Sequence, residues 1–106
     1  MTVRELFLGM PQAFQAHKAA GENLVFQFHI TGEEAGDWQV IIAEGRCRVA
    51  EGVHPRPTVT LTLSDRDWLD LARGKLGGMK AVMTGRLKVK GNLMAAQKLG
   101  SLFRLA

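Results

Sequence analysis

Hydrophobic residues recur along this chain first at helical spacing and then at every second position. Thr2 begins a first helix with the capping-box spacing to Glu5, and its apolar positions follow at helical intervals: Val3, Leu6, Phe7 and Met10. Pro11 is expected to break or restart this helix, so that residues 11–20 form a second short helix that Gly21 ends. The pattern therefore predicts a helical beginning before any strand.

From Leu24 the period changes to two, which is typical of strands with one buried face. Residues 24–31, 38–43 and 46–51 are predicted to form three consecutive strands. A two-residue turn at residues 44–45 sets the register of the second hairpin, with these expected pairs: Ala43 with Arg46, Ile42 with Cys47, and Val40 with Val49. This register places the apolar residues of both strands on the same side of an antiparallel sheet.

The second half of the chain returns to helices around two more strands. Residues 58–63 alternate strictly between threonine and an aliphatic residue, and Ser64 then caps a helix that Gly74 ends. Residues 74–91 combine glycine hinges, a short apolar helix at 79–83 and a strand at 86–90. A last helix follows Asn92, with this apolar stripe: Leu93, Ala96, Leu99, Leu102 and Phe103.

This order of elements predicts a single α+β domain over residues 1–106, with a five-stranded, mostly antiparallel sheet and helices packed on one face. The other face should be open to solvent, polar and basic. The residues expected there are Gln27, His29, Gln39, Arg46, Arg48, Thr58, Thr60, Thr62, Arg86, Lys88 and Lys90.

Composition narrows the class of protein and its partners. Apolar residues make up 46% of the 106 residues, enough for one core, and Cys47 is the only cysteine, so no internal disulfide can form. No run of eighteen apolar residues occurs, so a soluble, cytoplasmic protein is expected. The formal charge of +4 favours anionic partners, and transient contact of the basic sheet face with anionic membranes is expected.

Groups for catalysis, metal binding or nucleic-acid binding do not come together in the sequence. Residues 17, 29 and 54 are histidines on three different predicted elements, without metal-ligand spacing, and no phosphate-binding glycine motif occurs. Cys47 occupies an inward strand position and is interpreted as a core residue. The basic stripe has no interleaved aromatic residues for base stacking. We therefore expect no enzyme activity, no metal, no cofactor and no nucleic-acid partner.

Methionines stand out on the helical side of the predicted sheet. Met79, Met83 and Met94 can all lean toward the same sheet face. Flexible thioether side chains suit a pocket for variable apolar ligands, but methionine at helical spacing is also common in packed cores. Both interpretations stay open on composition alone.

Several short motifs follow one another in an order that identifies a family. They are Phe28-His29-Ile30-Thr31-Gly32-Glu33-Glu34 with Trp38, then Gly45, Gly52 and Val59-Thr60-Leu61-Thr62-Leu63-Ser64, and finally Gly74-Lys75-Leu76, Ala81, Met83, Gly85-Arg86-Leu87-Lys88-Val89 and Gly91. Together they resemble the sterol carrier protein 2 family of lipid-transfer domains over nearly the whole chain. Two departures bear on pocket shape: Gly77-Gly78 replaces an Asp-Pro or Asn-Pro pair, and Val82 stands where an aromatic residue is frequent.

The resemblance implies an apolar tunnel between sheet and helices that takes a fatty acid, fatty acyl-CoA, sterol or similar lipid. The residues predicted to bind the lipid are Val40, Val49, Leu61, Leu63, Met79, Met83, Leu99, Leu102 and Phe103. Residues 79–83, between glycines, are expected to form an adjustable wall of the tunnel. The alternative is an accessory or interaction module with a solid helical side, such as one assisting quinone synthesis. The identity of the lipid and the oligomeric state stay open.

Overall fold

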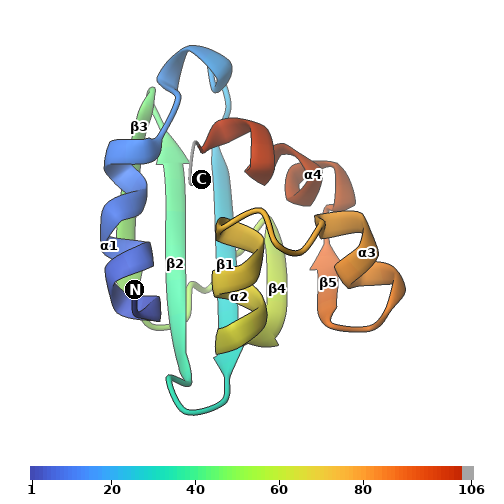
Figure 1. Cartoon of the computed structure of the whole chain (residues 1–106). Helices are drawn as coiled ribbons and strands as arrows, with labels where there is room; N and C mark the ends of the chain where they lie inside the picture. Colours follow the sequence, from blue (N-terminus) through green and yellow to red (C-terminus); the bar gives the residue numbers. More distant parts are fainter. Residues whose placement is uncertain (104–106) are drawn as a thin grey trace.

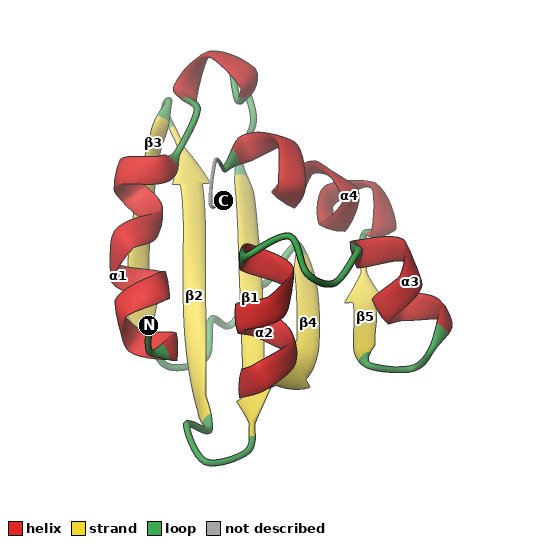
Figure 2. Ribbon diagram, in the orientation of Figure 1, coloured by secondary structure: helices red, strands yellow, loops and turns green. Residues whose placement is uncertain are grey.

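The computed structural model, which describes residues 1–103, is a five-stranded mixed sheet with helices on one face (Figures 1 and 2). The strands lie in the order β3-β2-β1-β4-β5. Their bounds are β1 Leu24–Thr31, β2 Gly36–Ala43, β3 Arg46–Glu51, β4 Val59–Ser64 and β5 Leu87–Gly91. The helices are α1 Val3–Ala13, α2 Asp65–Ala72, α3 Gly78–Met83 and α4 Leu93–Leu102, with a short 3-10 helix at Ala16–Lys18. The α+β class predicted from the sequence is confirmed.

The sheet is antiparallel except where β1 and β4 run parallel at its centre. The predicted register of the second hairpin is confirmed, with these pairs: Ala43 with Arg46, Ile42 with Cys47, and Val40 with Val49. Because β3 is one edge of the sheet and β4 lies beyond β1, residues 52–58 must pass over β2 and β1 between these strands.

The prediction that Gln27 is exposed to solvent is wrong. The crossing segment buries Gln27 on the sheet face that was expected to be open. Gln27 is only 1% exposed, and its Nε2 donates to the carbonyls of Trp38 at 3.1 Å and Gly52 at 3.0 Å. Its Oε1 accepts from the backbone N–H of His54 at 2.7 Å. A buried amide is stable when its donors and acceptors are satisfied, so Gln27 fastens the crossing segment to the sheet.

The first helix also differs from its predicted end. The capping box of Thr2 and Glu5 forms as expected, but α1 continues through Pro11 to Ala13. Pro11 lies in the last turn, where its missing N–H removes a single intrahelical hydrogen bond and the helix is about to end. The predicted second helix is reduced to the 3-10 turn at Ala16–Lys18.

Four aromatic residues, which we call the aromatic cluster, hold α1 and α2 against the sheet: Phe7, Phe28, Trp38 and Trp68. The ring of Phe7 stacks on Trp38 at 4.9 Å and on Trp68 at 5.3 Å between ring centroids, and meets Phe28 edge-on at 5.1 Å. Such ring contacts stabilise the fold in addition to the stabilisation from burying large apolar side chains. The sheet is therefore packed solidly beneath α1.

At the opposite edge, β5 begins one residue later than predicted. Arg86 precedes the strand and its Nη2 pairs with the Asp67 carboxylate at 2.6 Å. The prediction that Arg86 belongs to the open basic face is therefore wrong, because the carboxylate near the start of α2 draws it away. Lys88 and Lys90 do lie in β5, opposite Thr62 and Thr60 of β4.

Candidate apolar pocket

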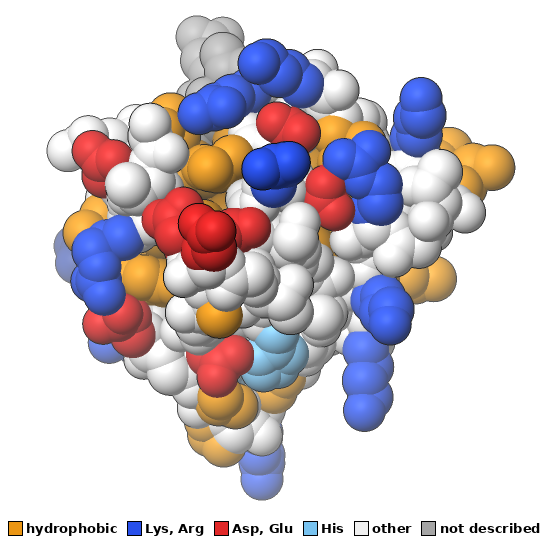
Figure 3. Space-filling model, turned by 60° about the horizontal axis from the view of Figure 1, so that its bottom comes forward, with side chains coloured by type: hydrophobic (Ala, Val, Ile, Leu, Met, Phe, Trp, Pro, Cys, Tyr) orange, Lys and Arg blue, Asp and Glu red, His pale blue; other side chains and the backbone are white. Residues whose placement is uncertain are grey.

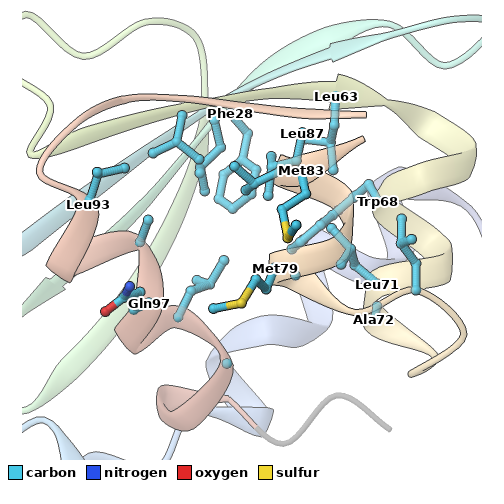
Figure 4. A pocket seen from close by; sticks show the side chains of 18 residues that line it. Phe28, Leu63, Trp68, Leu71, Ala72, Met79, Met83, Leu87, Leu93 and Gln97 are labelled. Atoms are coloured by element: carbon cyan, nitrogen blue, oxygen red, sulfur yellow. The ribbon is translucent and has the colours of Figure 1, made fainter. Parts of the chain in front are cut away.

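A pocket of about 600 Å³ lies between strands β4 and β5 and helices α2, α3 and α4 (Figure 4). Among its lining residues within the described chain, Gln97 is the only one that is neither hydrophobic nor glycine. The pocket occupies the side of the molecule away from α1, where Figure 1 shows α3 and α4 over the β5 edge.

Alternating aliphatic residues of β4 and β5 form the floor of this pocket. Leu61 pairs with Val89 and Leu63 pairs with Leu87, and all four line the pocket. Because side chains alternate across a strand, these pairs place four aliphatic groups on the same face of two adjacent strands. Phe28 of β1, which belongs to the aromatic cluster, also lines the pocket and joins its floor to that cluster.

Helix α2 closes one side. Ser64 caps the helix by accepting the Asp67 N–H at 3.1 Å, and Trp68, Leu71 and Ala72 then face the pocket. Trp68 is 2% exposed and lies 4.7 Å from Phe28 between ring centroids, so the aromatic cluster seals this end. Within residues 1–103, the Trp68 Nε1 meets no hydrogen-bond acceptor, in keeping with so apolar a wall.

Helix α3 forms a thin, open wall. Met79, Val82 and Met83 line the pocket, yet they are 74%, 46% and 80% exposed. Ala81 is the one buried residue of this six-residue helix. We expect so short a helix with so little buried surface to open at a lower free energy than the strands beside it.

The fourth wall comes from α4, which Asn92 caps by accepting the Ala95 N–H at 3.1 Å. Ala95 and Leu102 are buried in the core, while a second side of the helix lines the pocket. That side consists of Leu93, Ala96, Gln97, Leu99 and Gly100. Gln97 is exposed, so its amide is open to solvent.

The structure brings together five of the nine residues predicted to bind a ligand: Leu61, Leu63, Met79, Met83 and Leu99. Val40 and Val49 pair with each other in the half of the sheet that α1 covers, and Leu102 and Phe103 are buried at the end of α4. Those four residues therefore belong to packed regions outside the pocket. Met94 also lies outside it, with 71% exposure.

The sequence prediction omitted the α2 and β5 contributions to the pocket, Trp68, Leu71, Ala72, Leu87 and Val89. The β5 residues could have been found, because Leu87 and Val89 alternate as inward strand positions do. The α2 residues have no such signal, because the apolar side of a helix has the same sequence pattern whether it packs against a core or lines a cavity.

Cys47 of β3 and His29 of β1 do not line the pocket. Partial burial of Cys47 raises the pKa of its thiol to about 11, so the thiol is protonated near neutral pH. His29 Nδ1 contacts the Asp37 carboxylate at 2.5 Å on the open sheet face. Residues 1–103 contain no group of three potential metal ligands, and no helix among them is long and apolar enough to cross a membrane.

Comparisons with known proteins agree with this arrangement. A family model described as the SCP-2 sterol transfer family matches residues 11–104. The oleate-induced peroxisomal protein POX18 of Candida maltosa is 32% identical over 95% of this chain and 83% of its own length. The peroxisomal multifunctional enzyme type 2 of mouse is 40% identical over 73% of this chain. This chain spans only 11% of the length of that enzyme.

A solved structure shares the fold over nearly the whole chain. The palmitated SCP2L2 protein of Aedes aegypti, 25% identical, superposes with a TM-score of 0.75. The match covers 95% of this chain and 93% of the mosquito protein.

Proposed function

Because the chain belongs to the SCP-2 sterol transfer family, we propose that its pocket binds an apolar lipid and that the protein carries this lipid without catalysing a reaction. The observation that carries the proposal is the pocket of about 600 Å³ whose interior is lined by aliphatic, aromatic and methionine side chains. Pockets for small ligands usually have volumes of roughly 300–1,000 Å³.

The energetics favour occupancy by a long apolar chain. An unoccupied pocket leaves its apolar lining exposed to solvent on the α3 side, which is unfavourable. Burial of each methylene contributes about 0.8 kcal/mol, so ten of them contribute roughly 8 kcal/mol before ordering costs. Burial of an alkyl chain can therefore hold the ligand without a charged site.

The class of lipid follows from the same lining. Apolar walls discriminate mainly by volume, and one methylene changes the binding free energy by only about 1–3 kcal/mol. Fatty acids, fatty acyl-CoA and sterols are therefore all compatible with this apolar lining. The palmitated state of the mosquito protein makes a long-chain fatty acid the first ligand to test.

The test combines identification of the bound lipid with a variant that fills the pocket. The purified protein is denatured and extracted for mass spectrometry, and the delipidated protein is titrated with a fluorescent fatty acid. Ala96→Trp places a large ring in the pocket from α4, and we expect it to lower affinity by roughly tenfold or more. Met94→Trp, on the exposed side of the same helix, is the matched control and should bind like the parent.

Absence of extracted lipid together with absence of titratable binding would overturn the proposal and favour the accessory module. That alternative requires a solid interior on the helical side, whereas a pocket is present beside Leu61 and Met83. Transient contact with anionic membranes stays a prediction from the sequence. A cytoplasmic location stays a prediction from the sequence.

A further inference from the structure

The indole of Trp68 carries a hydrogen-bond donor that no group in residues 1–103 accepts. Trp68 is 2% exposed, and its Nε1 is the only buried side-chain nitrogen or oxygen of these residues without a partner. Gln27, at 1% exposure, shows the opposite, because its Nε2 donates to backbone carbonyls and its Oε1 accepts a backbone N–H. A buried donor without an acceptor loses its hydration and gains nothing in return, so this exception calls for a physical explanation.

The unsatisfied donor belongs to a residue of the pocket wall. Trp68 lines the pocket from α2, and in Figure 4 its side chain extends from that helix toward the space between the walls. Phe7 stacks on the indole with 5.3 Å between ring centroids, and Phe28 lies against it at 4.7 Å. These rings restrict the orientation of the indole but contain no oxygen or nitrogen acceptor. The donor is therefore held in a wall that a ligand in the pocket would contact.

The side chains of the other walls do not supply the missing acceptor. The described lining residues other than Gln97 are hydrophobic or glycine, and Gln97 lies on α4 with its amide open to solvent. A buried water is held by about two to four polar partners, and the lining side chains offer only the Trp68 N–H and this distant, solvated amide. A bound ligand is therefore the best source of an acceptor.

The lining also restricts the charge of that acceptor. No lysine, arginine or histidine is among the lining residues of the described chain. Figure 3 shows Lys and Arg side chains that project from the surface instead, on its right-hand side beside protruding hydrophobic groups. Burial of an unpaired carboxylate is far less favourable than burial of a hydroxyl or carbonyl group. The carboxylate of a fatty acid should therefore stay toward the solvent, and the oxygen that meets Trp68 should be neutral.

We propose that the lipid in the pocket is an oxygenated fatty acyl chain, whose hydroxyl or keto oxygen accepts a hydrogen bond from Trp68 Nε1. This inference rests on the proposed lipid-binding function and adds a point of specificity to it. Apolar walls recognise volume alone, so they do not distinguish two chains of equal length. A buried donor does distinguish them, because a plain chain leaves the N–H unsatisfied and an oxygenated chain satisfies it.

Titration with a matched set of fatty acids tests the proposal. The probes are one straight-chain saturated fatty acid and acids of the same length that carry a single keto group at successive carbons. A keto group buried without a donor should lower the affinity roughly tenfold. One keto position, where the oxygen reaches Trp68, should escape this loss and bind at least as tightly as the plain acid. We therefore expect the matched position to bind roughly tenfold more tightly than the mismatched positions.

Two variants with the same substitution locate the donor. Trp68→Phe removes the N–H and keeps an aromatic ring in the wall, so the advantage of the matched keto position should fall below about twofold. Trp38→Phe makes the same change in the aromatic cluster outside the pocket and should keep the advantage. Each advantage is a ratio of affinities within one variant, so a general loss of affinity does not affect it. Equal advantages in the two variants would overturn the assignment to Trp68.

Indole NMR provides a readout on the parent protein. The chain contains two tryptophans, so a ¹⁵N-labelled sample gives one indole signal for Trp68 and one for Trp38. We expect the matched keto acid to move the Trp68 Nε1–H proton downfield from its position with the plain acid, and to leave Trp38 nearly unchanged. The same Trp68 signal with both acids would overturn the proposal. The partner of the N–H would then be the face of Phe28 or a water molecule, neither of which depends on the ligand's oxygen.

The plain fatty acid separates this inference from the proposed function. Saturable binding of the plain acid, with similar losses for every keto position, would overturn the inference and leave lipid carriage intact. Absence of binding by every acid would overturn both. A downfield shift of the Trp68 signal with a sterol, but with none of the keto acids, would overturn the assignment of the ligand to a fatty acyl chain.

Discussion

The inner face of the sheet is covered in two different ways. Under α1, which we call the packed half, Phe7 is fully buried and the aromatic cluster fills the space down to β1 and β2. Under α3 and α4, the pocket half, Met83 lines a pocket and is 80% exposed. The strands show the same alternation in both halves, so the covering helices decide which half can take a ligand.

Helix length and side-chain burial account for the contrast. Helix α1 has eleven residues and buries four side chains, so it reaches the sheet along its whole length. Helix α3 has six residues and buries only Ala81. Stability should therefore reside mainly in the packed half, whereas changes in the pocket half should act mainly on ligand binding.

The largest effect is expected at the centre of the packed half. Phe7→Ala removes a ring that touches three other aromatic rings, and should lower the free energy of unfolding by about 3–5 kcal/mol. The neighbouring Leu8→Ala, at a side chain 57% exposed, is the control and should cost less than about 0.5 kcal/mol. Denaturant unfolding measures both. Similar losses of unfolding free energy in Phe7→Ala and Leu8→Ala would contradict the proposed difference between the packed half and the pocket half.

A smaller effect, on reactivity, is expected at Cys47 in the packed half. Burial raises the pKa of the thiol to about 11, so its alkylation at pH 8 should be roughly a hundredfold or more slower than in denaturant. The folded state also holds the thiol proton more tightly than the unfolded state. This contribution to stability is present below about pH 9 and is lost as the pH rises toward 11. Equal alkylation rates with and without denaturant would show that Cys47 is not shielded.

The smallest effect concerns the two glycines that flank α3 in the pocket half. Gly85 has φ +77°, a left-handed conformation, whereas Gly77 has φ −76°, and a Cβ at either position would meet open space. Gly85→Val should therefore lower the free energy of unfolding by about 1–2 kcal/mol through backbone strain alone. Gly77→Val, the matched control, should stay within about 0.5 kcal/mol of the parent. Equal thermal stabilities of the two variants would show that the left-handed turn is dispensable.

The sequence predicted the register of the sheet more reliably than the residues that line the pocket. The alternation of residues 24–51 and the turn at Glu44-Gly45 determine the register, because a slip by one residue would expose the apolar face. Val40 and Leu61 have the same inward pattern, however, and only Leu61 lines the pocket. A strand pattern does not reveal which helix will cover it, and that depends on tertiary packing.

The remaining errors also arise from contacts distant in sequence. Gln27 reads as an outward strand residue and is buried only because residues 52–58 cross over it. Arg86 reads as a strand cation and is drawn to Asp67 instead. The short helix between glycines at residues 79–83 was predicted correctly, since glycine spacing and an apolar run are local signals.

Lipid binding in the pocket half can be followed directly at the natural methionines. The protein is labelled with ¹³C at its methionine methyl groups and titrated with a long-chain fatty acid by NMR. Met79 and Met83 line the pocket, whereas Met10 is a buried residue of α1 in the packed half and Met94 is exposed outside the pocket. We expect large shifts and ligand contacts at Met79 and Met83, with Met10 and Met94 nearly unchanged. Contacts between the fatty acid and Met10, or saturable binding that leaves Met79 and Met83 unshifted, would contradict it.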